Sequence, residues 1–561
     1  IMDTSVKRAG KCTEEAKDDL KEAAAASSAQ SSCCCCQKCV PGFVPTNYRN
    51  ELVQLFKLAG PVVISQLMVF MIGFVSTVFC GHLGKTELAA VALSIAVINV
   101  TGICIGTGLS LTCDTLISQT YGSGNLKRVG VILQRGVLIL LLACFPCWAI
   151  LINTEPLLLA VKQSPEVASL SQLYVKIFMP ALPAAFMYQL QGRYLQNQGI
   201  IWPQVITGAI GNVFNAIINY VLIHQLDLGV AGSSAANAIS QYLLASVLFI
   251  YICLRGLHKA TWGGWSLDCL QEWGPFVQLA VPSMLMLCLE WWMFQVGGFL
   301  AGVISEAELG AQSVTYQLAS LAYMFPLGFA SAASVRVGNA LGAGNIEQAK
   351  LSCKVLKVLL SLSMRMCSRC LTIFVNMQTA EPARIFRDIL QRASDVIVIF
   401  SFLHLADAIG AVAGGVLRGV GKQLVGALCN LVGYYFIGLP TGASLMFAAK
   451  MGIVGFWTGL TVCVLVQSIF FITFLCRLDW KKAAEEAKVR AGVSGGESAG
   501  VDHVYMEVQI PEESKTTNTT TVGDVLSVSQ LLLRRGLTIL IMILILAAGI
   551  ITSTVLTLLL K

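Results

Sequence analysis

Long apolar runs separated by short polar stretches make up most of the chain from residue 58 onward. A helix that crosses the hydrocarbon core of a bilayer needs about 20 apolar residues, and a segment in lipid must satisfy its own backbone hydrogen bonds. Each run is therefore predicted to be a spanning helix, and the chain an all-α polytopic membrane protein. The thirteen predicted spans are 58–80, 88–111, 130–152, 170–190, 201–223, 230–254, 275–302, 309–333, 351–376, 394–416, 424–447, 452–476 and 537–560.

Short motifs occur twice along these runs, in the same order and about 220 residues apart. An even number of predicted helices, six, separates equivalent motifs, so the two halves should share one orientation, with an axis along the membrane normal. Parallel repeats of this kind are typical of transporters that bind substrate between the halves. The matching pairs are LAGP (58–61) with LAVP (279–282), TEL (86–88) with AEL (307–309), YGSGN (121–125) with LGAGN (341–345), and LGVAG (228–232) with MGIVG (451–455), at offsets of 221, 221, 220 and 223.

The duplication predicts two parallel-repeat six-helix lobes and a thirteenth helix outside them. The ninth span is the weakest, because Arg365 and Arg369 interrupt it. The predicted parts are a cytoplasmic N-terminal tail (1–50), an N-lobe (51–254), an inter-lobe cytoplasmic loop (255–274), a C-lobe (275–476), a disordered cytoplasmic linker (477–536) and the last helix (537–561). The N-terminal tail and the linker at 477–536 have compositions typical of disorder.

The N-terminal tail contains no apolar core of signal-peptide length, so we expect no cleavable signal peptide. Its CCCCQKC stretch at 33–39 fits palmitoylation near the membrane, a metal site, or an inert tail. One Cys-x-x-Cys pair supplies too few spaced ligands for a typical metal site. We favour acylation over metal binding, and an inert tail over both.

Composition and charge support the membrane assignment and suggest an orientation. The 561 residues are 56% hydrophobic and 12% charged, about half the charge of a soluble chain. The net charge of +7 concerns orientation more than partners, since basic residues gather in cytoplasmic loops. A cytoplasmic N-terminus puts nine basic residues inside and six outside, which predicts that Lys561 is extracellular. The inner set is Lys127, Arg128, Arg193, Arg255, Lys259, Arg336, Lys350, Arg418 and Lys422, and the outer set is Lys85, Lys162, Arg384, Arg387, Arg392 and Lys450.

Glu290 is the one formal charge in the run from Phe276 to Ile304. A charge at mid-bilayer costs about 2.5–3.5 kcal/mol on insertion scales, and such residues are usually functional. Dry surroundings favour the protonated carboxyl, whereas a bound organic cation favours the carboxylate, so proton and cation compete for one site. Nearby aromatic rings add cation–π attraction. Helical spacing predicts Met286, Leu287, Met293, Phe294 and Gly297 on its face, with Trp291 and Trp292 adjoining.

An intramembrane ion pair is the alternative role for this acid, with Arg365 or Arg369 as its partner. Asp407, one turn after His404, is a second candidate acid. It either carries a proton or pairs with a helix end. Glu290 and Asp407 are therefore the predicted proton/cation coupling residues.

Polar stripes on other spans predict the rest of a cavity. One stripe runs along a single face of the eighth span, where we favour the cavity. Polar stripes in spanning helices can also join helix to helix, and for the fifth and sixth spans the two roles stay open. The polar residues are Ser313, Tyr316, Gln317, Ser320 and Tyr323 on the eighth span, Asn212, Asn215 and Asn219 on the fifth, Asn237, Ser240 and Gln241 on the sixth, Gln66 on the first and Asn99 on the second.

Other chemistries lack the residues they need. The histidines outside the spans show no ligand spacing, so no metal or cofactor is expected. GHLGKT at 81–86 ends like a phosphate-binding loop, but Phe79 stands where that motif needs glycine, so ATP is not an expected partner. We expect neither an enzyme, since no nucleophile–base pair has suitable spacing, nor a nucleic-acid partner.

Several long motifs closely resemble vertebrate multidrug and toxin extrusion (MATE) transporters. The resemblance covers about residues 50–480, and the basic LLLRRGL (531–537) also fits. It implies two six-helix lobes with a central cleft, and export of organic cations in exchange for protons. The resemblance also implies that Glu290 is the carboxylate essential for transport and that Tyr316 and Tyr323 line the cavity. It further implies that Asn99 is the amide that the family carries on the second span. The motifs are CGHLGKTEL (80–88), INVTG (98–102), CDTLISQTYGSGNLK (113–127), VPSMLMLCLEWW (281–292), AASVRVGNALGAGN (332–345) and GGVLRG (414–419).

The sequence departs from the family pattern at three candidate positions. The resemblance implies acids in mammalian members where this chain has Gln295 and Gln317, and a glutamate where it has Asp407. Fewer carboxylates give an incoming cation less negative charge, which places divalent substrates in doubt. The match also fails across about 358–395.

We therefore predict a monomeric, proton-coupled exporter of organic cations and xenobiotics in the plasma membrane. Its predicted substrate-binding residues are Trp291, Trp292, Phe294, Gln295, Tyr316, Gln317, Tyr323, Gln66 and Asn99. A flippase or exporter of another amphiphile with the same two lobes, transport uncoupled from protons, and a channel remain alternatives. A flippase would need more basic residues in its cleft, and a channel a continuous polar pore.

Overall fold

The computed structural model describes residues 46–81, 83–355, 384–493, 520–522 and 525–560. Glu51–Lys561 forms one compact unit and Ile1–Asn50 another, of which the described part is the start of the first helix. Every regular element among the described residues is helical. Twelve helical segments within the described ranges are long and apolar enough to cross a membrane, so the chain is a multi-pass membrane protein.

Helices cover every predicted span of the first half, residues 51–254. The second predicted span, which was expected to end at 111, continues through a short break as far as Gly122. The elements are α2 (Thr46–Gly81), α3 (Lys85–Ile98), the π-helical η1 (Asn99–Ile103), α4 (Cys104–Ser110), α5 (Thr112–Gly122), α6 (Leu126–Leu151), α7 (Thr154–Ala160), α8 (Pro165–Phe178), η2 (Met179–Ala181), α9 (Leu182–Asn197), α10 (Trp202–Tyr220), the π-helical η3 (Val221–Gln225) and α11 (Gly229–Leu254).

The second half, residues 273–476, follows the same plan. The ninth predicted span, with Arg365 and Arg369, lies mostly outside the described residues. The elements are η4 (Leu267–Leu270), α12 (Trp273–Ile304), α13 (Glu306–Gly342), α15 (Arg384–Val420), α16 (Gln423–Asn430), the π-helical η5 (Leu431–Gly438), α17 (Leu439–Ala443), the π-helical η6 (Ser444–Ala448) and α18 (Ile453–Cys476). Arg384, Arg387 and Arg392, predicted in an outer loop, therefore lie on a helix.

The two halves repeat the same unusual backbone conformations. Gly124 and Gly344 both have positive φ, 81° and 76°, and are the second glycines of YGSGN and LGAGN. Glycine is needed there because a Cβ disfavours this region. The same agreement joins Gly199 with Gly421, Asp227 with Lys450, and Gly229 with Gly452. The π-helical η3 and η6 also begin 223 residues apart.

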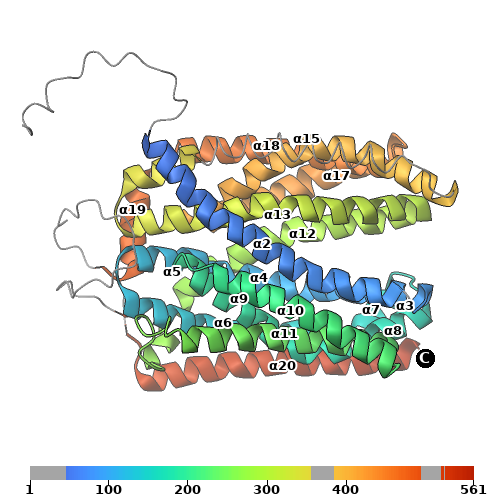
Figure 1. The fold of residues 1–561 in the computed structure, drawn as a ribbon, viewed down its shortest axis with the longest axis horizontal. Helices are drawn as coiled ribbons and strands as arrows, with labels where there is room; N and C mark the ends of the chain where they lie inside the picture. Colours follow the sequence, from blue (N-terminus) through green and yellow to red (C-terminus); the bar gives the residue numbers. More distant parts are fainter. Residues whose placement is uncertain (1–45, 82, 356–383, 494–519, 523–524, 561) are drawn as a thin grey trace, which may run out of the picture. The chain divides into compact units, whose positions relative to one another are not determined.

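Each half has a hydrophobic cluster of its own. One is built mainly from the first half and includes Tyr174, Phe186 and Leu248. The other belongs to the second half and includes Phe456 and Trp457. Within Glu51–Lys561 the helices numbered α3 to α11 and those numbered α12 to α18 gather in two groups (Figure 1), and they meet where α5 packs on α13 and α4 packs on α12.

Residues 480–491, predicted to belong to a disordered linker, form α19 (Trp480–Ala491). The prediction was wrong because the segment has no apolar run of lipid length, although it has strong helix signals. Asp479 caps the helix by accepting the backbone N–H groups of Lys481 and Lys482, and Gly492 follows it at φ 75°. Its buried face is made of Ala483, Ala484, Ala487 and Ala491. We call the end of the helix bundle at which α19 lies the α19 end.

The last helix, α20 (Val528–Leu560), begins nine residues before the predicted 537 and packs along α6 (Figure 1). The Asn153 Nδ2 donates to the Gly549 carbonyl at 3.0 Å. Before the helix, the chain is tied down by Gln271, whose side-chain amide exchanges hydrogen bonds of 3.0 and 3.1 Å with the Leu526 backbone. This stretch of the predicted linker is therefore ordered.

Candidate functional site

Glu290 lies near the middle of α12 in a half-buried position. Met286, Met293 and Gly297, expected on its face, are buried. A Cβ on Gly297 would overlap the ring of Phe456, and Met293 belongs to the hydrophobic cluster of the second half. These three residues are therefore used in packing and are not open to a guest molecule.

Four residues from three other helices surround this carboxyl. Tyr323 of α13 directs its hydroxyl toward Glu290. Asp407 and Arg418, both buried on α15, lie close enough to interact electrostatically with the Glu290 carboxyl. The buried Tyr434 of η5 does so as well. The second half thus brings together the two predicted acids, one predicted tyrosine, and two residues to which the sequence assigned no site role.

Neither predicted acid forms an ion pair within the part of the chain that the structure describes. No Lys, Arg or His nitrogen there lies within 4.0 Å of the Glu290 or Asp407 carboxyl oxygens. His404, one turn before Asp407, is buried against Phe400 with ring centroids 5.3 Å apart. The alternative ion-pair partners in the ninth span lie outside the described residues, so that alternative stays a prediction.

Aromatic rings pack around Phe294 on α12, four residues after Glu290. Phe294 packs at 5.9 Å from the ring of Tyr316 and at 5.9 Å from that of Trp457. Gln295 approaches the Tyr316 hydroxyl. Gln317 is exposed on α13 while Tyr316 is half-buried. The cavity role that the sequence analysis favoured for the stripe on this helix stays a prediction.

The first half meets this group of residues at η1. Asn99 is exposed and begins the π-helical turn η1, a distortion often found at functional sites. The Trp292 indole donates to the Val100 carbonyl at 3.1 Å, so it joins α12 to η1. Trp291 and Gln66 are half-buried, and no described contact joins either of them to Glu290.

A buried ion pair in the first half was missed by the sequence reasoning. Arg193, predicted to lie in a loop, is buried on α9 and contacts the Asp114 carboxylate of α5 at 3.4 Å. The same Arg193 nitrogen reaches the Ser331 hydroxyl of α13 at 3.4 Å, and Asn197 donates to Asp114 at 3.1 Å. Arg418, also predicted in a loop, is buried in a helix and lies within electrostatic range of Asp114. Asp114, Arg193 and Arg418 lie just outside the predicted apolar runs 88–111, 170–190 and 394–416, so charges within the predicted spans gave no signal for this cluster.

The asparagines of α10 and α11 join helices to one another. Asn215 donates to the Asn237 side chain at 3.2 Å and to the Ser240 hydroxyl at 2.9 Å. Asn219 donates to the Ser76 hydroxyl at 3.2 Å. All these residues are buried. Of the two roles left open for this stripe, the structure therefore favours helix–helix contact.

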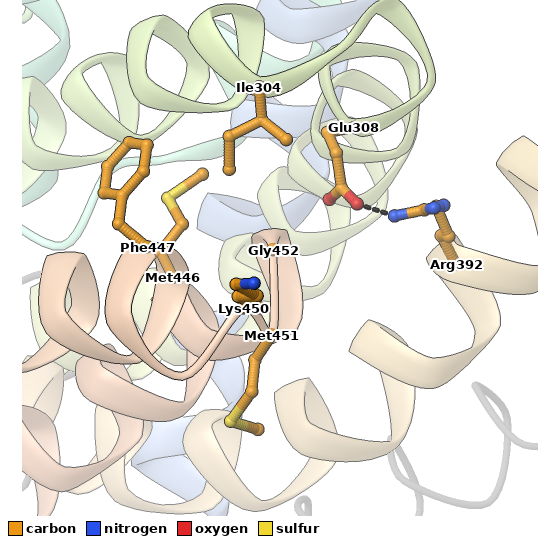
Figure 2. Close-up of a pocket in the computed structure, with 8 residues that line it drawn as sticks. All are labelled: Ile304, Glu308, Arg392, Met446, Phe447, Lys450, Met451 and Gly452. Carbon is orange, nitrogen blue, oxygen red and sulfur yellow. Dashed lines mark ion pairs between the residues drawn. The ribbon is translucent and has the colours of Figure 1, made fainter.

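A separate pocket of about 360 Å³ lies in the second half, between the end of α12, the start of α13, α15, and the turn from η6 to α18. Figure 2 shows Glu308 and Arg392 facing each other across it, with Lys450 nearby. Glu308 forms an ion pair with Arg392 and accepts the Ile453 backbone N–H at 2.8 Å. It thereby caps α18, so we assign it a structural role. None of the predicted site residues lines this pocket.

No three His, Cys, Asp or Glu side chains gather as a metal-binding group among the described residues. The candidate site is therefore a pair of carboxyls, Glu290 and Asp407, with tyrosines beside them and a buried arginine in range. Such a group can bind a proton or an organic cation, and it lacks the nucleophile and base of a hydrolytic centre.

The chain matches known proteins over most of its length. The MatE family model matches twice, over residues 61–221 and 282–443, which together exceed half of the chain. The multidrug and toxin extrusion protein 1 of Danio rerio is 63% identical over 553 residues, covering 93% of this chain and 93% of that protein. The human protein of the same name is 49% identical over 532 residues, covering 90% and 93%.

Solved structures agree with the sequence matches. The crystal structure of the eukaryotic MATE transporter AtDTX14 superposes with a TM-score of 0.75 at 28% identity, covering 79% of this chain and 99% of that one. The Vibrio cholerae MATE transporter VcmN in its bent form gives 0.65 at 19% identity, covering 80% and 100%, and shows the fold alone. On the family model and these relatives together, the chain belongs to the MatE family, the family of the multidrug and toxin extrusion proteins.

Proposed function

We propose that this chain is a secondary active transporter that exports organic cations and xenobiotics in exchange for protons. The observation that carries the proposal is the pair of carboxyls, Glu290 and Asp407, which lie inside spanning helices without an ion-pair partner among the described residues. An uncompensated charge in the membrane interior is costly. Each acid is therefore stable either with a bound proton or with a cationic guest. Members of this family are transporters and not enzymes.

Exchange follows from the inability of one carboxyl to hold both ligands. A protonated Glu290 is neutral and binds an organic cation weakly, and an arriving cation favours release of the proton. The hydroxyl of Tyr323 can donate to the carboxylate, and the rings of Phe294 and Tyr316 provide faces for cation–π contact. Further side chains are proposed to contact the organic cation around these two acids. They are the amides of Gln295, Gln317, Gln66 and Asn99 and the rings of Trp291 and Trp292. Asp407 is proposed as the second coupling acid.

Two lobes moving against each other would expose this centre to each side in turn. The repeated backbone conformations and the separate hydrophobic clusters support an N-lobe at 51–254 and a C-lobe at 275–476. At the α19 end the lobes are closed: the Thr115 hydroxyl donates to the Arg418 carbonyl at 2.6 Å, and the Gln119 amide to the Gly419 carbonyl at 2.8 Å. We propose a total of thirteen spans, counting the ninth.

We propose that the protein is a monomer in the plasma membrane, because export from a cell requires that location. The charge bias supports a cytoplasmic N-terminus, with the α19 end in the cytoplasm and Lys561 outside. Arg128, Arg193 and Arg418 are buried and count less toward this bias than loop residues do. Six of the nine predicted inner residues then remain, against three outer ones once Arg384, Arg387 and Arg392, which lie on α15, are set aside.

A flippase for an amphiphile is the second candidate. The buried Arg418 near Glu290 is the one observation that favours it, since a lipid phosphate would need a cation. The two neighbouring acids weigh against it. Uncoupled transport and a channel are also outcomes of the test below.

The test is uptake of a fluorescent organic cation by cells that express the protein. An outward proton gradient, set by alkaline medium, should speed uptake, and acidic medium should slow it. Glu290→Gln should abolish the pH response with normal surface expression, whereas Glu166→Gln, at an exposed position on α8, should leave it intact. Uptake that ignores pH would reject coupling, and channel-like currents would reject alternating access.

A further inference from the structure

Two sulfur atoms meet where the halves of the protein are in contact. The Sγ atoms of Cys104 on α4 and Cys288 on α12 are 3.2 Å apart, and both residues are fully buried. The contact lies in a row along the two helices. One turn away on one side, Gly108 packs so closely that a Cβ would come within 2.6 Å of the Met284 Cα. One turn away on the other side lies the hydrogen bond from Trp292 to Val100.

The fold does not need a pair of thiols at this contact. Gly328 packs against Val63 of α2, and these residues lie 220 and 221 positions from Gly108 and Met284. The α2–α13 contact is thus the repeat-related counterpart of the α4–α12 contact. At the positions equivalent to Cys104 and Cys288 it carries Met324 and Leu67, so two apolar side chains occupy these positions without a thiol pair.

We propose that Cys104 and Cys288 form an oxidisable thiol pair whose disulfide joins the two halves of the transporter. Hydrogen peroxide is a sufficient oxidant. One thiol attacks the peroxide and becomes a sulfenic acid as the O–O bond breaks and one water leaves. The second thiol then attacks that sulfur, forming the S–S bond and releasing a second water. Two electrons pass to the peroxide, and no metal or cofactor is needed.

The two sulfurs are already in contact. A disulfide requires them to approach to about 2 Å, so the 3.2 Å separation must shorten by about 1 Å. Because both thiols are buried, a small neutral oxidant is required, and reaction should be faster while transport moves the halves against each other. The consequence for transport rests on the proposed function. A covalent link between α4 and α12 restrains the movement of the two halves that alternating access requires, and a reductant restores that movement.

The first measurement does not depend on transport. A protease site is inserted between the exposed Lys259 and Ala260 in the full-length protein in proteoliposomes. The protein is treated with hydrogen peroxide, its free thiols are blocked, and the inserted site is cleaved. On a denaturing gel, wild type should then run as one band without reductant and as two bands with reductant. Cys104→Ser and Cys288→Ser should each give two bands in both cases. Cys463→Ser, a buried cysteine in the cluster of the second half, should behave as wild type.

Cys147 is the competing partner, because it also lies within electrostatic range of Cys288. A link that survives Cys104→Ser but is lost in Cys147→Ser would overturn the assignment, as would the absence of any link in wild type. In the second measurement, cation uptake should fall in proportion to the linked fraction and recover with dithiothreitol. Full uptake by fully linked protein would overturn the restraint, whereas absence of uptake in every form would contradict the proposed transport and leave the link established.

Discussion

Gly122 packs directly against the backbone of Asn339, so that a Cβ on this glycine would overlap the Asn339 carbonyl. The reciprocal contact joins Gly342 to the Gln119 carbonyl in the same way. Since 119 and 339, and also 122 and 342, differ by 220, replacing both residues of one contact by their counterparts in the other half gives the second contact. A two-fold relation between the halves produces such exchanged pairs. At the α19 end, α5 and α13 therefore meet backbone to backbone.

Gly122→Ala should prevent this closure. The added methyl has no space, because what it meets is main chain rather than a movable side chain. We expect the α19 end to open, with faster hydrogen–deuterium exchange in α5 and α19 and slower cation transport. Gly73→Ala is the matched control, since a Cβ at that position on α2 meets nothing within 4 Å. Equal exchange and equal transport in the two variants would show that the contact does not hold the end closed.

Glu486 of α19 should make closure of this end depend on pH. Burial raises the pKa of its carboxyl, but the hydrogen bond and charge of Lys422, at 2.8 Å, together with Arg490, outweigh burial and lower the pKa overall. A lowered folded-state pKa gives stability that is present above the unfolded value, about 4.3, and is lost as pH falls through the folded value.

The protection of α19 against hydrogen exchange should therefore weaken on strong acidification. Glu486→Gln should show the weaker protection already at neutral pH and respond little to acid. The effect should be about 0.2–1 kcal/mol, because the pair is partly exposed. Glu485→Gln, at the exposed neighbouring position, should follow wild type. If both variants titrate alike, the Lys422 contact is not the cause.

Glu308 should matter for stability and not for proton coupling. Its carboxylate pairs with Arg392 and accepts the first backbone N–H of α18 at 2.8 Å. Glu308→Ala removes both contacts and should lower the free energy of unfolding by about 1–2 kcal/mol, as for loss of a helix cap, seen as a lower Tm. Glu308→Gln keeps an acceptor and should lie between. The pH dependence of cation uptake by the folded fraction should stay as in wild type. A changed pH dependence would make this acid part of the coupling site.

Hydrophobic length was enough to predict the spanning helices of the described residues, because lipid leaves a long apolar segment few alternatives. The duplicated motifs also predicted which backbone positions are special, as the positive φ of Gly124 and Gly344 confirms. Glu290 and Asp407 stood out for the same reason: each is a rare charge in an apolar run. The structure puts the two acids within electrostatic range of each other.

The failures involve residues whose partners are remote in sequence. Arg193 looked like a loop residue because nothing near it in the chain reveals Asp114, 79 positions away, as its partner. The helix α19 was missed because its alanine face is buried against other helices and not against lipid. Met293 and Gly297 share a helix face with Glu290, yet helical spacing cannot tell a cavity wall from a packed surface. The π-helical turn at Asn99 has no sequence signal that we used.

The packing of α20 along α6 has a practical use. The last helix packs mainly along α6, where the Asn153 side chain donates to the Gly549 carbonyl, and it meets the second half at Trp273, whose ring lies under Arg535. We therefore expect α20 to move with the first half. A spin label on an outward position of α20, paired with one on α18, would then record how far the two halves separate during a cycle, without a probe placed in the cavity itself.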